Sequence, residues 1–357
     1  MRIAVIGGGL FGCTAAVHLA RAGLEVHLYE QSGHLLSVAS TINQCRLHSG
    51  YHYPRSPQTI RECQEGLASF REEYGEAIID GGEQYYAIAL AGSKVSGPDY
   101  LKVLLANGLP FERHTPGFLN RGALETVIKV REARIDPERL KYAVAKKISD
   151  VVIRVHLTPA PKDLREEFDK IIVAAYASTN EVMCDLGCPL VPLQYELCEK
   201  PVIRLPDTMR KVSAVVMDGP FCSIDPWGDS GYHVMGHVRH AIHSAHVAMD
   251  ARMPEHLEQY LNCGLVEDKT HSAFEKFREA GKVFIPALAD AEHIGSMWTV
   301  RAVLPNRDHD DARPTLVSQI DDQVIRVFSG KLGCAVTAAQ NIVSSLDKTD
   351  VSVQSAA

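Results

Sequence analysis

The first thirty residues restrict the fold of this chain more than any other segment. An apolar, strand-like run at residues 3–6 leads into Gly7-Gly8-Gly9-Leu10-Phe11-Gly12, and a helical pattern follows over residues 13–22. A second strand-like run at residues 25–29 then ends in Glu30. A strand, a glycine-rich turn, a helix, a second strand and a terminal acid make up the dinucleotide-binding unit of Rossmann-type sheets. The sequence therefore predicts an α/β fold that begins with such a unit.

Each conspicuous residue of this unit has a physical task. Gly7 permits the tight turn, Gly9 lets a pyrophosphate approach the backbone, and Gly12 allows the helix to pack closely on the strand. The helix that starts near Leu10 presents free N–H groups and the positive end of its dipole to phosphates. Glu30 can accept hydrogen bonds from a ribose diol. These five residues are the first predicted cofactor-binding residues, although the unit alone does not separate FAD from NAD.

Composition limits the class of protein and its partners. The chain has 357 residues, 46% of them hydrophobic, which is enough for a buried core and two domains. Its net charge is −7 with no long basic run, which argues against nucleic acid or anionic membranes as partners. No apolar stretch approaches the roughly 20 residues that span a bilayer. Nine scattered cysteines fit reduced thiols in a cytoplasmic protein, and the Cys184/Cys188 pair has no second pair that would complete a zinc site.

Regular elements are predicted along the remainder of the chain. Pro137 behind the N-cap residue Asp136 opens a helix, and an apolar run at 169–175 indicates a buried strand. The other expected elements are a helix at 59–74, strands at 84–91 and 125–130, mostly β structure over 189–249, helices at 255–261 and 269–280, a strand at 324–328 and a helix at 334–343.

Two further segments carry most of the remaining chemical information. The run Asn43-Gln44-Cys45-Arg46-Leu47-His48-Ser49-Gly50-Tyr51-His52-Tyr53-Pro54-Arg55-Ser56 gathers two histidines, two arginines and two tyrosines beside two helix breakers. Near the C-terminus, Ser329-Gly330-Lys331-Leu332-Gly333 forms a turn that precedes a helix of small residues.

This order of motifs resembles the D-amino-acid-oxidase-like (DAO) family of FAD-dependent oxidoreductases over nearly the whole chain. The resemblance implies a Rossmann-type FAD-binding domain of the glutathione-reductase type and a mostly antiparallel β-sheet substrate domain. The FAD domain is expected at residues 1–75, 137–187 and 298–357, and the substrate domain, which caps the flavin ring, at 76–136 and 188–297. Because no cysteine lies between Trp298 and Ser329, where some relatives tether their flavin, we expect the FAD to be held without a covalent bond.

The resemblance also implies further cofactor-binding residues. The turn formed by Gly330, Lys331, Leu332 and Gly333 matches the family turn near the flavin ring, where helix N–H groups stabilise charge that develops on reduction. In the N-terminal part, the segment with Ser40, Arg46, Leu47 and His48 is expected to contact FAD, and residues 43–50 are locally similar to L-2-hydroxyglutarate dehydrogenase. Two departures from the family pattern are Tyr176, where a glycine is usual, and Val300-Arg301-Ala302 in place of a glycine-arginine-proline run.

Three residues are candidates for catalysis. Arg301 either fixes a substrate carboxylate with two parallel N–H···O bonds or forms a salt bridge with Asp308 or Asp310. His48 either acts as a base toward an alcohol or only orders the flavin segment. Tyr232 is expected on a substrate-domain strand that covers the ring.

For two basic residues in the predicted flavin segments, alternatives stay open. Arg46 either contacts flavin or substrate or pairs with Glu62 or another acid. Lys331 either lies beside a flavin carbonyl or points to water.

A histidine cluster requires a separate explanation. His233, His237, His240, His243 and His246 fall within fourteen residues. The last three are spaced to share one face of a helix. Since no carboxylate or cysteine lies among them to complete a familiar ligand set, we expect no bound metal there.

We therefore expect an FAD-dependent enzyme that oxidises an amine or amino acid at its α C–N bond by hydride transfer to flavin N5. The alternative is oxidation of a 2-hydroxy acid or another alcohol. A third hypothesis is a protein that keeps FAD as a structural element without redox chemistry. The expected partners are a small-molecule donor, with or without a carboxylate, and oxygen or a quinone as electron acceptor.

Overall fold

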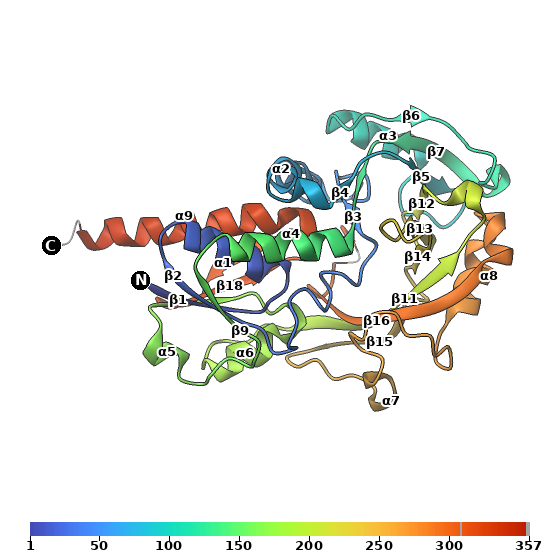
Figure 1. Ribbon diagram of the computed structural model, residues 1–357. Helices are drawn as coiled ribbons and strands as arrows, with labels where there is room; N and C mark the ends of the chain where they lie inside the picture. Colours follow the sequence, from blue (N-terminus) through green and yellow to red (C-terminus); the bar gives the residue numbers. More distant parts are fainter. Residues whose placement is uncertain (308, 355–357) are drawn as a thin grey trace.

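The computed structural model describes residues 1–307 and 309–354, with side chains of the last helix described as far as Leu346. Two large sheets dominate these residues, and Figure 1 shows them at opposite ends of the molecule. The α/β class expected from the sequence is confirmed, with a Rossmann-type sheet at one end and a mostly antiparallel sheet at the other.

The smaller of the two large sheets contains the dinucleotide-binding unit. Its strand order is β17 (Leu316–Gln319), β18 (Val324–Phe328), β10 (Lys170–Val173), β1 (Arg2–Ile6), β2 (Glu25–Tyr29) and β9 (Ile153–His156). All neighbours in this order pair in parallel except β17 and β18, which are antiparallel. Helices α1 (Leu10–Arg21), α4 (Pro137–Ser149) and α9 (Ala335–Gln354) cover one face, while α5 (Leu164–Glu167) and α6 (Thr179–Asp185) lie on the other (Figure 1).

Glycines decide how closely α1 approaches its strand. A Cβ atom on Gly12 would lie 1.8 Å from the carbonyl oxygen of Gly7, and one on Gly7 would lie 2.5 Å from the carbonyl oxygen of Ala174. Gly7 also has a φ of +110°, which side-chain-bearing residues rarely adopt. Both positions therefore need glycine for the fold itself, as the sequence predicted.

The remaining predicted elements around this sheet form for recognisable reasons. Asp136 caps α4 by accepting hydrogen bonds from the backbone N–H groups of Glu138 and Arg139 at 2.9 and 3.0 Å. Helix α2 (Pro57–Tyr74) begins behind Ser56, whose hydroxyl accepts from the N–H of Thr59. Phe70 and Tyr74 of α2 are buried in the core formed with α1, α4 and α9. A third, small sheet consists of β3 (Arg46–Leu47), β8 (Ala133–Ile135) and β4 (Ile78–Ile79), in that order.

The second sheet is larger and mostly antiparallel. Its order is β15 (Ile242–Ala248), β11 (Leu193–Arg204), β14 (His233–His237), β13 (Cys222–Pro226), β12 (Val212–Met217), β5 (Glu83–Ala89), β7 (Leu124–Val130) and β6 (Glu112–Arg113). The long strand β16 (Glu292–Val303) also pairs with β11. Only β12 and β5 are parallel among its paired strands in the described chain. Helices α3 (Gly97–Ala106), α7 (Glu255–Glu258) and α8 (Phe274–Gly281) accompany this sheet.

Some boundaries differ from the sequence expectation. The helix expected at 255–261 is the short α7, and α8 begins at Phe274 rather than near residue 269. Residue 298, the expected start of the last FAD-domain segment, lies inside β16 and pairs with Glu199 of β11 in the large sheet. Strand β16 therefore runs across the boundary that the sequence placed between residues 297 and 298.

The interpretation of His240, His243 and His246 as one helical face is wrong. His243 and His246 belong to strand β15, where side chains alternate with a period of two rather than 3.6. Pairing of β15 with β11 overrides the local spacing.

Candidate active site

A cavity of about 1030 Å³ lies between the two sheets. Its wall combines the carboxyl end of β1, most of residues 36–48, one face of β11 and β16, the loop after β16 and the turn at 329–332. The predicted site residues that line it are Gly7, Gly9, Leu10, Glu30, Ser40, Arg46, His48, Arg301, Gly330, Lys331 and Leu332. Residues more than 300 positions apart in the sequence thus face one space.

One end of the cavity fits a dinucleotide. Gly9 is the N-cap of α1, with an ordinary φ of −72°, and its only neighbour within 4 Å of an added Cβ is the hydroxyl of Ser40 at 3.2 Å. The protein's own packing therefore does not require glycine at this position. A group that approaches the backbone there, such as a pyrophosphate, does require it.

Ser40 and Glu30 surround this helix N-terminus. The backbone N–H of Leu10 donates to the Ser40 hydroxyl at 3.0 Å. Glu30 accepts from the N–H groups of Gly8 and Ser32, both at 2.7 Å. Each carboxylate oxygen of Glu30 keeps a lone pair for a further donor such as a ribose hydroxyl. The arrangement fits the adenosine half of FAD.

The turn at 329–333 lies at the cavity wall, and its contact with the flavin ring stays a prediction. The Lys331 side chain is buried instead of pointing to water, and its ammonium donates to the carbonyl of Arg313 and lies 3.8 Å from Glu62. Gly330 and Leu332 face the cavity. Gly333 and Leu47 lie behind the wall, because a Cβ on Gly333 would meet the Leu47 side chain at 3.1 Å.

His48 faces the cavity in front of a buried carboxylate. Its Nδ1 lies 3.8 Å from the carboxylate of Glu132 and has no hydrogen-bond partner among the described residues. Glu132 accepts from the N–H of Ser49 at 2.8 Å and from the hydroxyl of Tyr86 at 2.6 Å. Although burial opposes ionisation, the nearby His48 ring, the charge of Arg46 and the Tyr86 hydroxyl lower the pKa of Glu132 to about 2. Glu132 is therefore a charged group behind the His48 ring.

Arg46 is tied into the same network and not to Glu62. Its guanidinium donates to Asp225 at 2.6 Å and to the Ser213 hydroxyl at 2.8 Å. It also lies 3.8 Å from Glu132 and 5.3 Å from the ring centre of Tyr86. Arg46 thus holds buried carboxylates in place at the edge of the cavity.

His52 is the neutral member of this group. Its ring centre lies 5.5 Å from that of His48, and its Nδ1 is buried without a described partner. Burial, followed by the charges of His48 and Arg46, lowers the pKa of His52 to about 3. His52 therefore stays neutral at pH 7.

His52 is expected to make stability depend on pH. A histidine whose pKa falls from 6.5 unfolded to about 3 folded destabilises the fold as pH drops below 6.5. Between pH 7.5 and 5 this group costs about 2 kcal/mol. His52→Gln should remove that part of the loss, measured by guanidinium unfolding of the flavin-bound protein at both values. An unchanged pH dependence in the variant would contradict the assignment.

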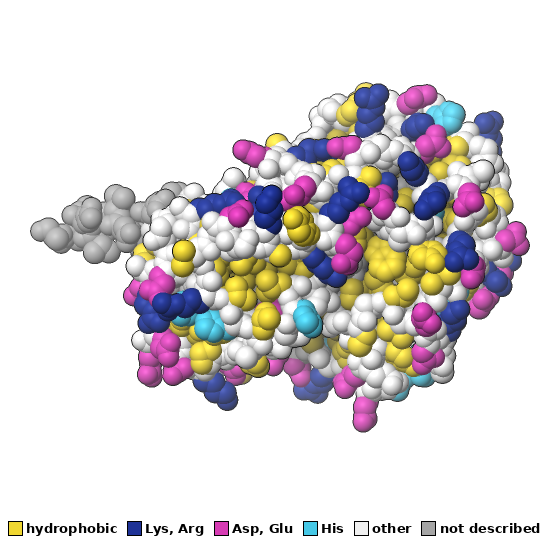
Figure 2. Space-filling view, viewed as in Figure 1, with side chains coloured by type: hydrophobic (Ala, Val, Ile, Leu, Met, Phe, Trp, Pro, Cys, Tyr) yellow, Lys and Arg dark blue, Asp and Glu magenta, His cyan; other side chains and the backbone are white. Residues whose placement is uncertain are grey.

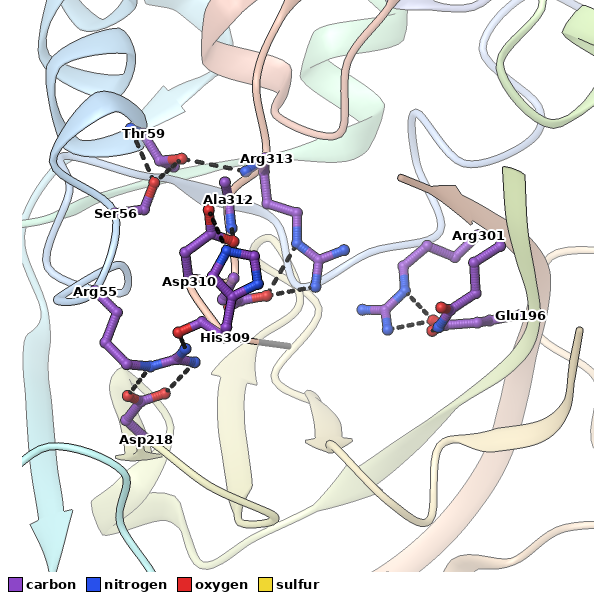
Figure 3. Close-up of polar contacts among 12 residues, drawn as sticks. Arg55, Ser56, Thr59, Glu196, Asp218, Arg301, His309, Asp310, Ala312 and Arg313 are labelled. Atoms are coloured by element: carbon purple, nitrogen blue, oxygen red, sulfur yellow. Dashed lines mark hydrogen bonds and ion pairs between the residues drawn. The ribbon is translucent and has the colours of Figure 1, made fainter. Parts of the chain in front are cut away.

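Arg301 has a partner that the sequence did not indicate. The pairing of β11 with β16 places Glu196 opposite Arg301. The Nε of Arg301 donates to the Glu196 carboxylate at 2.6 Å (Figure 3). The expected alternative partners are not involved as far as the structure describes them. Asp310 pairs with Arg307 and His309, and Asp308 lies outside the described residues. Arg301 still lines the cavity, but its guanidinium is already paired with Glu196.

The loop after β16 closes one side of the cavity. Arg313 pairs with Asp311, and its guanidinium points toward Arg301 across open space in Figure 3. The backbone N–H of Arg313 donates to Thr59 at the start of α2. Arg55, which pairs with Asp218, donates to the carbonyl of His309 at 2.5 Å. These contacts attach the loop to both halves of the molecule.

Tyr232 and most of the histidine cluster lie outside the cavity wall, although His237 lines it. Tyr232 is not among the residues that line the cavity, and its hydroxyl accepts from Arg204 at 3.2 Å. His233 contacts the carbonyl of Val212, and His243 contacts Glu199 at 2.8 Å. Within the described chain no group of three or more His, Cys, Asp or Glu side chains is placed to hold a metal ion.

With this geometry established, the comparisons with known proteins decide the family. A family model described as FAD-dependent oxidoreductase (DAO) matches residues 2–325. The chain belongs to the DAO family of FAD-dependent oxidoreductases. The DAO resemblance drawn from the sequence is thereby confirmed, and so are FAD as cofactor and an enzymatic role. The hypothesis of a purely structural FAD loses its support.

Curated relatives of this DAO-family chain are fungal. The FAD-dependent monooxygenase kojA of Aspergillus flavus is 26% identical over 370 residues, covering 96% of this chain and 85% of that protein. The FAD-dependent monooxygenase FPY4 of Fusarium mangiferae is 34% identical over 114 residues, which is 32% of this chain and 31% of FPY4. The chain thus matches only about a third of the length of FPY4.

Solved structures with the same fold act on different donors. Glycine oxidase from Geobacillus kaustophilus has a TM-score of 0.70 at 14% identity, with 97% of this chain and 95% of that chain covered. L-α-glycerophosphate oxidase from Mycoplasma pneumoniae has a TM-score of 0.72 at 14% identity, with 97% and 94% covered. At this identity the likeness shows the DAO fold and not the substrate.

Other surface features add little to the assignment. No helix among the described residues is long and apolar enough to cross a membrane. On the face drawn in Figure 2, basic and acidic side chains are interspersed and form no continuous basic patch.

Proposed function

We propose that this DAO-family enzyme oxidises a carbon that bears a hydroxyl group, in a 2-hydroxy acid or another alcohol, with His48 as the base. The observation that carries the proposal is the pair formed by His48 at the cavity wall and the buried carboxylate of Glu132 behind it, 3.8 Å apart. An alcohol must lose its hydroxyl proton as its C–H bond is broken, so its oxidation needs a positioned base.

The residues described above would hold FAD. Gly7, Gly9 and Leu10 would hold the pyrophosphate, Glu30 would accept from the ribose, and the turn at Gly330 would contact the ring. When bound, the flavin supplies the N5 atom that accepts the hydride.

His48 has the surroundings of a general base. With Nδ1 directed toward Glu132, Nε2 is left to accept the hydroxyl proton of a donor in the cavity. The charge that then develops on the imidazole is stabilised by Glu132, which stays ionised because its pKa lies near 2. His52 is neutral beside it and adds no competing charge.

Oxidation of an amine or amino acid at the α C–N bond, favoured by the sequence, is the second candidate. It is supported by Arg301 in the cavity wall and by the fold shared with glycine oxidase. Against it, an amine that is already deprotonated needs no base, so such a donor would leave the His48–Glu132 pair without a catalytic task.

One experiment separates these candidates. The flavin-bound enzyme is mixed anaerobically with amines, amino acids, 2-hydroxy acids and other alcohols while flavin bleaching is followed. A hydroxyl donor should bleach the flavin and yield a carbonyl product without ammonia. Bleaching only by amines, with release of ammonia, would contradict the proposal. Reoxidation of the bleached enzyme with oxygen or with a soluble quinone then identifies the acceptor, and a cytoplasmic location remains an expectation from the sequence.

The Glu196–Arg301 pair yields a further prediction. If a donor carboxylate binds Arg301, Glu196→Gln should tighten donor binding because Arg301 then lacks a competing anion. Arg301→Met should weaken binding of the same donor by about 2–5 kcal/mol, since a buried carboxylate loses its partner. Both are measured from the donor dependence of flavin reduction, and equal affinities in the two variants would place the carboxylate elsewhere.

A further inference from the structure

A row of polar side chains runs along one face of β11. Successive residues of a strand point to opposite sides, and the alternate residues Gln194, Glu196, Cys198 and Lys200 all line the cavity. On the paired strand β16, Arg301 opposes Glu196 and Thr299 opposes Cys198 on the same face. Lys200 is the last member of the row. It lies two residues further along β11 than Cys198, the residue that pairs with Thr299.

Most enclosed cations of the cavity have an acid beside them. The pairs are Arg46–Asp225, Arg55–Asp218, Arg301–Glu196, Arg313–Asp311 and Lys331–Glu62. Glu196 is further occupied by the amide of Gln194, which donates to it at 2.6 Å. These acids are therefore already committed to other groups.

Lys200 differs from these cations. Across residues 1–307 and 309–354, no ion pair and no hydrogen bond of its ammonium is found. Lys200 is half-buried, and a charged group that loses part of its hydration without a partner gains nothing in return. Burial accordingly lowers the pKa of Lys200, and the nearby positive charge of Arg301 acts in the same direction. An anion placed beside the ammonium would offset both effects.

We infer that Lys200 forms an anion-binding subsite that takes the carboxylate or phosphate group of the donor. This inference rests on the proposed function only in calling that anion part of the donor. Arg301 is the weaker candidate for the same task because Glu196 already meets its charge. A lysine ammonium binds anions as a point charge, so it accepts either a carboxylate or a phosphate without a fixed geometry.

The test measures anion binding in the absence of turnover. The flavin-bound enzyme is titrated with inorganic phosphate, sulfate and acetate at constant ionic strength, by calorimetry and by the flavin absorbance spectrum. Tighter binding of phosphate or of acetate shows which type of anionic group the subsite prefers. Variants are Lys200→Met, which keeps the length of the side chain without its charge, Lys200→Arg, which keeps the charge, and Lys211→Met, an exposed lysine outside the cavity, as control.

The expected result is a loss of about tenfold or more in affinity for the preferred anion in Lys200→Met. Lys200→Arg should retain most of the affinity, and Lys211→Met all of it. Unchanged affinity in Lys200→Met would overturn the inference, and so would loss of FAD from that variant, since Lys200 would then serve the cofactor. Because no donor is turned over, these outcomes are independent of whether the enzyme oxidises an alcohol or an amine.

Discussion

Gly9→Val should yield a folded protein without FAD. The backbone of Gly9 has a φ of −72°, which valine adopts readily, and an added Cβ would meet only the Ser40 hydroxyl at 3.2 Å. The branched side chain would instead fill the space where the pyrophosphate must touch the backbone at the start of α1. Flavin content is measured by absorbance after purification, and folding by far-ultraviolet circular dichroism.

Two other glycines serve as controls for this substitution. Gly75→Val makes the same change at an exposed position with nothing within 4 Å of the added Cβ, and it should retain full flavin content. Gly12→Val should fail to fold, because its Cβ would lie 1.8 Å from the Gly7 carbonyl oxygen. A folded Gly9→Val protein with normal flavin content would refute the assignment of this turn to the pyrophosphate.

His48→Asn should slow flavin reduction by an alcohol donor by about 10²- to 10⁴-fold, the usual contribution of a general base. Asparagine can still donate a hydrogen bond in the cavity but cannot take up a proton, so donor binding should change much less than the rate. The measurement is the limiting rate of anaerobic flavin bleaching after rapid mixing. An amine donor that is deprotonated before hydride transfer should be less sensitive to this change.

Glu132→Gln tests the support behind His48. Without the negative charge, the imidazolium that forms during reduction is less stable. His48 then stays neutral down to lower pH, so the pH dependence of the reduction rate should shift toward lower pH. His256→Asn, on the exposed helix α7, is the matched control and should leave the rate unchanged. If every donor reduces the flavin of the His48→Asn variant at the normal rate, His48 is structural and the base lies elsewhere in the cavity wall.

The sequence determined the parts of this protein that depend on local pattern. The βαβ unit, the cap of α4 at Asp136 and the strand at β18 follow from residue order within short windows, because turns, caps and strand periodicity depend on nearby residues. The spacing of Gly7, Gly9 and Gly12 likewise indicated a dinucleotide cofactor. The same local reasoning failed for His243 and His246, since their spacing of three suits a helix while β15 pairs with β11.

Only the tertiary structure decided which charges meet in the cavity. Glu132 follows β7 and reaches His48 from 84 residues away along the chain, and nothing in its surrounding sequence marks it. Glu196 reaches Arg301 through the register of β11 with β16, which no short window of sequence specifies. Lys200 likewise faces the cavity, half-buried and without a described partner, because it shares one face of β11 with Glu196. The local sequence places each of these residues on a strand or loop, but their charges interact only because the two sheets fold against one cavity.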